Sequence, residues 1–267
     1  MIKLIATDID GTLFNTQGEI SPLTKASIMA AHEQGIILML ASGRSIHGLK
    51  ALALHNGLPL NHMVLVGCNG AVVADGEKEK IIFEEPIKLD LAKKLIENLR
   101  THPVTQMIPE GHYLFVEEKN GYLVDFESET ENLTKKVLND LTQIDFPPTK
   151  IILTAEPDKQ FQTQKTLIAQ FGHEANFVMS GSVYIDVMAV GIDKGAALKH
   201  YCELKGILPS EVIAFGDNYN DVGMIAYAGV SVAMANAVDE LKAKAKYITL
   251  SNDDDGIAVF LDQYLSK

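Results

Sequence analysis

The stretch Ala6-Thr7-Asp8-Ile9-Asp10-Gly11-Thr12-Leu13 directly follows an apolar run that begins at Ile2. A short apolar run that ends in acidic residues and a glycine predicts a buried strand followed by a turn. Asp8 and Asp10 then lie at the carboxyl end of this strand, which is the edge where ligands bind in open α/β sheets. Taken alone, the pattern fits an ordinary polar turn equally well, so the rest of the chain must decide between the two readings.

From this stretch to about residue 82, helical and strand patterns alternate. Ser21-Pro22 predicts a helix start, with serine as the N-cap and proline at the first helical position. Residues 36–41 form a continuous apolar run before Ser42-Gly43, which is typical of a parallel strand buried on both faces. The pattern continues with a helix at 45–54 and strands at 63–66 and 71–73.

The middle of the chain has a different character. Tyr113, Phe115, Tyr122, Val124 and Phe126 occupy alternating positions around Lys119-Asn120-Gly121, which predicts a β-hairpin. Helices are expected at 90–101, 129–141 and 158–171, and strands at 150–154 and 182–187. Antiparallel strands with helices on one face make an α+β unit. We therefore expect residues 83–187 to be an inserted domain.

Strand and helix alternation resumes after the insert. Helices are expected at 193–204, 221–228 and 256–265, and strands at 212–215, 230–234 and 247–250. The sequence thus predicts an α/β fold. Its Rossmann-like, doubly wound parallel-sheet core consists of residues 1–82 and 188–267, interrupted by the α+β insert.

Composition narrows the classes of partner. Lys and Arg total 23 against 35 Asp and Glu, a formal net charge of −12, which repels nucleic acid and anionic membranes. A small anion would therefore need a local cationic pocket. Cys68 and Cys202 lie in no C-x-x-C spacing and predict neither a disulfide framework nor a zinc site. No apolar run resembles a signal peptide or is long enough to span a bilayer, so we expect a cytoplasmic protein.

Four turns carry side chains suited to phosphoryl chemistry. Asp8 and Asp10 lie in the first, while Ser42-Gly43 offers a hydroxyl and an accessible backbone amide to an anion. Asp193-Lys194-Gly195 places a cation at a helix amino terminus, which already favours anions. The loop from Gly216 to Asp221 is rich in the carboxylate and amide oxygens that hard cations prefer. Each turn alone has a simpler reading as a polar loop, a helix cap or a solvated lysine.

Together the four turns supply carboxylates for Mg²⁺, a carboxylate nucleophile, a hydroxyl and an amide for phosphoryl oxygens, and one lysine. Carboxylates this close would repel one another without a cation. The cation in turn allows an anionic nucleophile to approach an anionic phosphate.

These motifs resemble those of the haloacid dehalogenase-like phosphatases, and specifically of the Cof-type sugar-phosphate phosphatase group. Asp8-Ile9-Asp10-Gly11-Thr12-Leu13 matches the family's D-x-D-G-T-L motif in full. Ser42-Gly43-Arg44, Lys194-Gly195 and Gly216-Asp217-x-x-Asn220-Asp221 match its other three motifs. Asn69-Gly70-Ala71 further resembles this subgroup. The resemblance extends over essentially the whole chain.

The resemblance implies a mechanism and roles for individual residues. Asp8 is the nucleophile that forms an aspartyl-phosphate, and Asp10 is the general acid and base. Mg²⁺ is held by Asp8, the backbone carbonyl of Asp10 and Asp217, with Asp221 in support. The phosphoryl group is bound by a wider set: Ser42, the amides of Ile9 and Gly43, Lys194 and Asn220. The insert becomes a cap that selects a small phosphorylated metabolite.

Two other functions remain open at this point. A phosphomutase or phosphotransferase would use the same intermediate but pass the phosphoryl group to a sugar hydroxyl. A non-catalytic phospho-acceptor module would also use an acidic pocket and a lysine. Asp10 and the insert argue against the acceptor module, since a signalling acceptor needs neither an acid for a leaving group nor a lid. The sequence does not indicate the physiological substrate or the oligomeric state.

Overall fold

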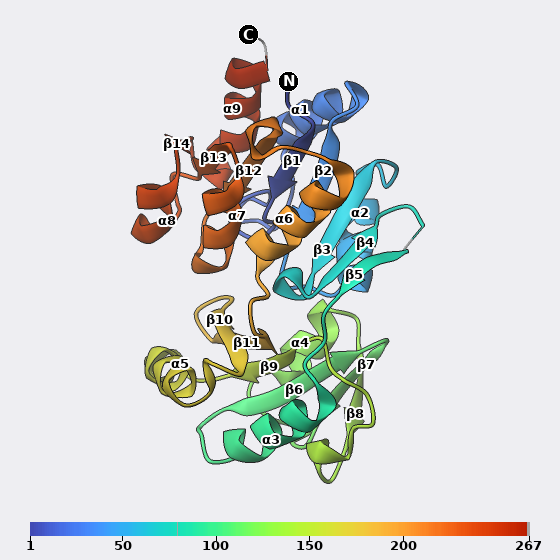
Figure 1. The fold of residues 1–267 in the computed structure, drawn as a ribbon, viewed down its shortest axis with the longest axis vertical. Helices are drawn as coiled ribbons and strands as arrows, with labels where there is room; N and C mark the ends of the chain where they lie inside the picture. Colours follow the sequence, from blue (N-terminus) through green and yellow to red (C-terminus); the bar gives the residue numbers. More distant parts are fainter. Residues whose placement is uncertain (79, 266–267) are drawn as a thin grey trace. The chain divides into compact units, whose positions relative to one another are not determined.

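The computed structural model describes residues 1–78 and 80–265, and the chain folds into two compact units. The first unit joins Met1–Phe83 to Asp193–Lys267, and the second is the intervening segment Glu84–Ile192. In Figure 1 the first unit combines the blue to cyan amino-terminal part with the orange to red carboxyl-terminal part, and the second is green to yellow. Each unit has its own sheet and its own apolar core.

An eight-stranded sheet forms the first unit, with β1 (Leu4–Thr7) near its middle. β12 (Val212–Gly216) and β2 (Ile37–Ala41) pair with β1 in parallel on its two sides. The outer strands are, on one side, β13 (Val230–Ala233) and β14 (Tyr247–Ile248), and on the other, β3 (Met63–Gly67), β4 (Val72–Asp75) and β5 (Ile81–Glu84). β4 runs antiparallel to β3, whereas all neighbouring strands from β14 to β3 are parallel.

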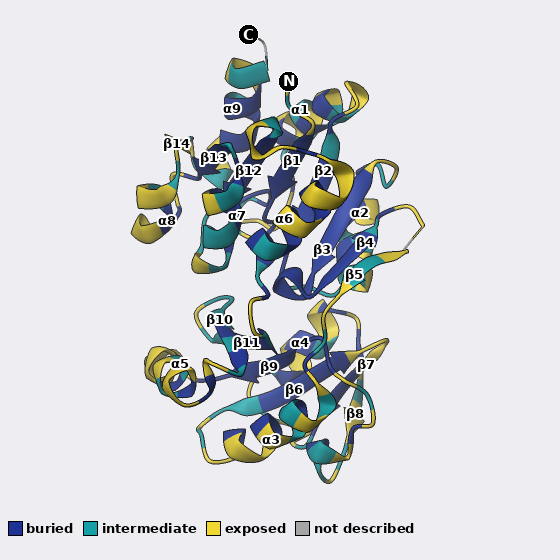
Figure 2. Ribbon diagram, in the orientation of Figure 1, coloured by how far each residue is buried: buried dark blue, intermediate teal, exposed yellow. Residues whose placement is uncertain are grey.

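Helices pack on both faces of this sheet. One apolar cluster combines the sheet with α1 (Pro22–Glu33), α2 (Ile46–His55) and α9 (Gly256–Leu265). A second cluster combines the opposite face with α6 (Lys194–Lys205), α7 (Val222–Tyr227) and α8 (Asp239–Lys244). Figure 2 shows the strands between these helices as largely buried. Burial on both faces explains the uninterrupted apolar runs of the central strands, and the predicted α/β, doubly wound fold class is confirmed.

Local sequence signals begin the core helices. Ser21 accepts a hydrogen bond from the backbone N–H of Thr24 at 3.0 Å, and Pro22 occupies the first turn of α1. Asp193 caps α6 in the same way, through the N–H of Ala196 at 2.7 Å. Both caps satisfy backbone donors that a helix start leaves unpaired. The cap at Asp193 also fixes where α6 begins, and so where the side chain of Lys194 starts.

The second unit is a six-stranded sheet in the order β10-β11-β9-β6-β7-β8. Its strands are β6 (Thr105–Glu110), β7 (Tyr113–Val116), β8 (Thr134–Val137), β9 (Ile151–Thr154), β10 (Ala175–Met179) and β11 (Tyr184–Ala189). Neighbouring strands are antiparallel except β7 and β8. α3 (Leu89–Leu99) and α5 (Pro157–Phe171) pack in one apolar cluster, and α4 (Val124–Thr130) in another.

Two expectations for this unit are wrong. The hairpin predicted around Lys119-Asn120-Gly121 does not form, because Val124–Thr130 is the helix α4. The segment after it was expected to be helical over 129–141, but Thr134–Val137 is the strand β8, paired in parallel with Tyr113–Val116. Asn132, with φ 53°, interrupts the helical path between the two elements. Pairing with Tyr113–Val116 overrides the local pattern in this segment.

Candidate active site

Asp8 follows β1 directly, at the carboxyl edge of the parallel sheet. Its backbone N–H donates to the carbonyl of Phe215 on β12 at 3.2 Å, which continues the strand pairing into the turn. The residue is 6% exposed. Gly11, in the same turn, has φ +84°, and a Cβ there would lie 2.5 Å from Oδ2 of Asp217. The glycine therefore allows the turn after β1 and the turn after β12 to meet.

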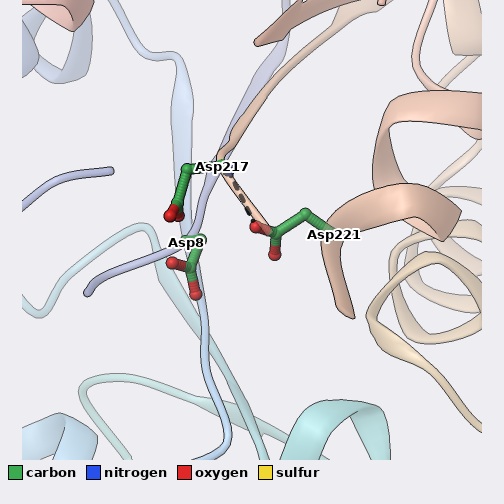
Figure 3. Close-up of side chains that lie close together, drawn as sticks. All are labelled: Asp8, Asp217 and Asp221. Atoms are coloured by element: carbon green, nitrogen blue, oxygen red, sulfur yellow. Dashed lines mark hydrogen bonds between the residues drawn. The ribbon is translucent and has the colours of Figure 1, made fainter. Parts of the chain in front are cut away.

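The turn after β12 supplies two more carboxylates. Asp221 is completely buried, and its Oδ2 accepts hydrogen bonds from the backbone N–H groups of Asp217 and Asn218, each at 3.0 Å. Asp217 in turn accepts a hydrogen bond from the hydroxyl of Thr12 at 2.7 Å. Figure 3 shows Asp8, Asp217 and Asp221 gathered from these two turns, with the dashed line joining Asp217 and Asp221. Asp221 thus shapes the loop that presents Asp217.

Lys194 lies at the first position of α6 and is completely buried. Its Nζ is 2.5 Å from Oδ1 of Asp8 and 2.7 Å from Oδ1 of Asp221. One ammonium therefore binds carboxylates from the ends of two adjacent strands. A buried charge must be paired to be tolerated. The Lys194 ammonium and the carboxylates of Asp8 and Asp221 meet this requirement by pairing with each other.

The carboxylates are crowded enough to change how readily they ionise. Burial raises the pKa of Asp8 well above its usual range, repulsion from Asp221 raises it further, and Lys194 opposes the shift. Burial and then Asp221 raise the pKa of Asp217 to about 6, against a smaller opposing effect of the Thr12 hydrogen bond. Burial alone would lower the pKa of Lys194, but Asp221 and Asp8 outweigh it and raise the pKa. One lysine does not neutralise three neighbouring acids.

The residues present fit a divalent cation. Asp8, Asp217 and Asp221 each offer a carboxylate oxygen, and these oxygens lie within 4.8 Å of one another. Hard oxygen ligands in a charge-rich pocket are the donor set that Mg²⁺ prefers. Asp221 already uses Oδ1 for Lys194 and Oδ2 for two backbone amides, so Asp8 and Asp217 are better placed as direct ligands.

The other residues expected at the site lie in the same unit but are held by different partners. Ser42 is 3% exposed, and its Oγ accepts a hydrogen bond from the N–H of Arg44 at 3.2 Å. Ile9 is fully buried, and Gly43 lies beside Ser42 in a partly exposed turn. The amide of Asn220 donates from Nδ2 to Oδ1 of Asn69 at 3.1 Å.

Asp10 differs from the other acids because its side chain is 61% exposed. Its carboxylate oxygen Oδ1 lies 3.1 Å from Nη2 of Arg44. It is absent from the carboxylate group of Asp8, Asp217 and Asp221 that the described residues form. An exposed carboxyl at the end of the same turn can exchange protons with solvent, which the buried acids cannot do readily.

Sequence reasoning assigned no role to three residues that contact this site. Thr12 binds Asp217, Arg44 binds Asp10, and Asn69 binds Asn220. Thr12 and Arg44 belong to motifs quoted above, and Asn69 opens the Asn69-Gly70-Ala71 stretch. Their positions were therefore visible in the sequence, whereas their partners, up to 205 residues away, were not.

Comparison with known proteins identifies the family. A family model described as haloacid dehalogenase-like hydrolase matches residues 5–261, nearly the whole chain. The chain belongs to the haloacid dehalogenase-like hydrolases. A solved haloacid dehalogenase-like hydrolase from Bacteroides thetaiotaomicron is 32% identical to it, with a TM-score of 0.86 over 98% of this chain and 99% of that one.

Two curated relatives of this haloacid dehalogenase-like hydrolase are named phosphatases of Escherichia coli. A 5-amino-6-(5-phospho-D-ribitylamino)uracil phosphatase is 30% identical over 99% of this chain and 96% of the relative. A pyridoxal phosphate phosphatase is 28% identical over 98% of each chain. The predicted family and the predicted phosphatase class are thereby confirmed. Within the part of the chain that the structure describes, no helix combines the length and the apolar character needed to cross a membrane.

Proposed function

We propose that this hydrolase cleaves phosphomonoesters of small metabolites, with sugar phosphates as the main class, in a Mg²⁺-dependent reaction through an aspartyl-phosphate on Asp8. The observation that carries the proposal is the position of Asp8. Its carboxylate shares a pocket with two further acids and lies 2.5 Å from the ammonium of Lys194. This environment suits a carboxylate nucleophile that must approach a phosphate anion.

Asp8 attacks phosphorus while the bond from phosphorus to the ester oxygen breaks. Asp10 gives a proton to the departing alcohol, then takes one from the water that attacks the aspartyl-phosphate, and the bond between Asp8 and phosphorus breaks to release phosphate. The 61% exposure of the Asp10 side chain supports this assignment, because an acid and base must reach both the leaving group and water.

Binding of the phosphoryl group falls to residues from the remaining turns. We assign this role to Ser42, the backbone amides of Ile9 and Gly43, Lys194 and Asn220. Mg²⁺ would be held by Asp8, Asp217 and the backbone carbonyl of Asp10, with Asp221 in support. When bound, the cation would offset the negative charge that the carboxylates and the phosphoryl group bring together.

Selection of the substrate is assigned to the second unit, Glu84–Ile192, as a cap domain. The named activities of the relatives toward pyridoxal phosphate and a phosphoribitylamino-uracil support a small phosphorylated metabolite as the substrate class. We also place the protein in the cytoplasm, since Cys68 and Cys202 are both buried free thiols, which suits a reducing compartment.

The direct test measures phosphate release from a panel of phosphosugars, nucleotides and cofactor phosphates in MgCl₂ and in EDTA. Asp8→Asn should lower turnover roughly a thousandfold or more, because asparagine keeps the shape but is not an anionic nucleophile. When the substrate has a good leaving group, Asp10→Asn should still become phosphorylated, but its aspartyl-phosphate should hydrolyse slowly. Phosphorylated protein should therefore accumulate, and mass spectrometry should detect the added phosphoryl group. Asp262→Asn, at an exposed position of α9, is the matched control. It should neither lower turnover nor cause phosphorylated protein to accumulate.

Substantial turnover by folded Asp8→Asn, or undiminished turnover of the wild-type protein in EDTA, would contradict the mechanism. Phosphoryl transfer to added sugars in preference to water would instead assign the same intermediate to a phosphotransferase.

A further inference from the structure

The turn after β3 has an unusual backbone. Cys68 and Asn69 both have φ 50°, and Gly70 follows with φ 109°. Left-handed backbone is unfavourable for most residues with a side chain, including cysteine, although asparagine tolerates it better than most. Such conformations cluster at functional sites. Cys68 is 4% and Asn69 1% exposed, so neither adopts this conformation as part of a loose surface loop. The surroundings of the turn must hold it.

Backbone hydrogen bonds tie this turn to the one after β2. The N–H of Cys68 donates to the carbonyl of Arg44 at 2.8 Å, and the N–H of Asn69 donates to the carbonyl of Ser42 at 2.9 Å. Two successive amides of the left-handed turn thus donate to the Ser42 turn. The position of Ser42, an assigned phosphate ligand, is therefore coupled to the backbone at Asn69.

The side chain of Asn69 extends the same connection to the turn after β12. Its Oδ1 accepts a hydrogen bond from Nδ2 of Asn220 at 3.1 Å, across 151 residues of sequence. An asparagine amide carries two N–H groups. Anchoring one of them fixes the plane of the Asn220 amide and leaves the second N–H with a defined direction in which to donate to an anionic oxygen.

Gly70 completes the connection at the amino end of α6. A Cβ on Gly70 would lie 2.3 Å from the backbone oxygen of Asp193 and 3.1 Å from the nitrogen of Lys194. The turn thus packs against the backbone that begins the helix carrying Lys194. Three of the four turns that supply the site contact residues 68–70.

We propose that Asn69 is a positioning residue for phosphate binding. Its side chain orients the amide of Asn220, while its backbone holds the Ser42 turn, so that donors from separate strands are in place before the phosphate arrives. The inference rests on the proposed function, because it assumes that Asn220 binds the phosphoryl group. Donors fixed in advance lose less conformational freedom when the anion binds.

Asn69→Gly is the sharpest variant, because glycine accepts the left-handed backbone and keeps its N–H bond to Ser42 while removing the side-chain acceptor. The dissociation constant for inorganic phosphate in MgCl₂ should rise about fivefold, as for the loss of one hydrogen bond, and KM should rise by a similar factor with a smaller change in kcat. Asn132→Gly is the matched control, an exposed asparagine with φ 53° in the second unit, and should leave both constants unchanged.

A double-mutant cycle with Asn220→Ala tests whether Asn69 acts through Asn220. In the Asn220→Ala background, Asn69→Gly should change phosphate affinity by less than about twofold. Equal effects of Asn69→Gly in both backgrounds, or no effect in the wild-type background, would overturn the inference while leaving the phosphatase assignment intact.

Failure of the proposed function has a different signature. A wild-type protein that hydrolyses no phosphomonoester but binds inorganic phosphate with the predicted coupling would refute the phosphatase activity and support the positioning role. A wild-type protein that does neither refutes both. If Asn69→Gly does not fold, NMR of the wild-type protein provides the test. The side-chain amide protons of Asn220 are identified by their absence from the spectrum of Asn220→Ala. They should exchange with solvent more slowly than those of exposed asparagines, and equal exchange rates would overturn the inference.

Discussion

The ammonium of Lys194 lies 2.5 Å from Oδ1 of Asp8, and both residues are buried. The two residues lie 186 residues apart in the sequence. Asp8 follows β1, and Lys194 begins α6, which packs in the same apolar cluster as β1 and β12. Lys194 also binds Asp221, which shapes the loop carrying Asp217. A single cation therefore connects the proposed nucleophile with the proposed metal-binding loop.

Lys194→Met should destabilise the protein by about 3–5 kcal/mol in EDTA at pH 7, because it leaves buried carboxylates without their cation. Lys199→Met is the matched control on the same helix. Its side chain is 59% exposed and its pair with Glu203 is long, at 3.9 Å, so its loss should cost less than about 0.5 kcal/mol. Urea unfolding measures both values.

Added MgCl₂ or a lower pH should restore part of the stability of Lys194→Met, since either reduces the repulsion among the carboxylates. Equal stability of the two methionine variants in EDTA would show that Lys194 does not carry the charge balance of the site.

The affinity for Mg²⁺ should weaken as the pH falls below about 6. Burial and Asp221 raise the pKa of Asp217 to about 6, above the value near 4 of an unfolded chain. The folded, metal-free protein therefore binds this proton more tightly than the unfolded chain does, and the contribution of Asp217 to stability decreases as the pH rises from about 4 to 6. Mg²⁺ must displace the proton, so its affinity should fall up to about tenfold per pH unit in the acidic range.

Calorimetric titration of MgCl₂ from pH 5 to pH 8 measures this dependence. Asp8, whose pKa is also raised by burial and by Asp221, should contribute to the same dependence. A dissociation constant that does not change across the whole range would contradict the assignment of these two acids to the metal.

Gly70→Ala should impair activity far more than an equivalent substitution elsewhere. Its Cβ would lie 2.3 Å from the backbone oxygen of Asp193, and neither backbone can yield without moving the start of α6 and Lys194. Gly206→Ala is the control, because Gly206 also has a positive φ, +65°, but a Cβ there meets nothing within 4 Å.

Gly206→Ala should lower the free energy of unfolding by about 1–2 kcal/mol and leave kcat/KM unchanged. Gly70→Ala should lower kcat/KM at least about tenfold. Similar kcat/KM values for the two variants would show that the contact between Gly70 and Asp193 does not position the site.

The core was predictable because its signals are local. Asp8 and Asp217 each follow a short apolar strand, and Lys194 follows a capping aspartate, so a few adjacent residues sufficed to place each turn. Parallel strands bring their carboxyl ends to one edge, and that rule gathers the turns after β1, β2 and β12. The contacts between the turns were not predictable, since the partners of Thr12 and Asn69 lie 205 and 151 residues away.

The second unit was harder for a related reason. The Thr134–Val137 segment combines two lysines with a threonine and a valine, so its composition does not decide between helix and strand. It is a strand because Tyr113–Val116 offers it a pairing edge. Val124 is likewise buried from within a helix, although its spacing from Tyr122 and Phe126 fits a strand. Tertiary contacts decide both cases, through strand pairing for Thr134–Val137 and through burial in an apolar cluster for Val124. A local sequence pattern carries no information about such contacts.

Removal of the second unit should separate chemistry from substrate selection. The apolar clusters of the first unit draw all their described members from Met1–Phe83 and Asp193–Lys267, and those of the second from Glu84–Ile192. A chain in which a short flexible linker replaces Glu84–Ile192 should therefore fold and bind Mg²⁺. It should hydrolyse p-nitrophenyl phosphate slowly, because all the residues assigned to the chemistry lie in the first unit.

The kcat/KM values of the shortened chain for different phosphosugars should become similar, because the proposed cap would no longer contact the sugar or exclude water. The measurement is kcat/KM for the panel used above, compared with the full-length protein. The isolated Glu84–Ile192 segment, which should fold with its own sheet but release no phosphate, serves as the control. A folded core that keeps the full-length order of preference would place substrate selection in the first unit and remove the proposed role of the second.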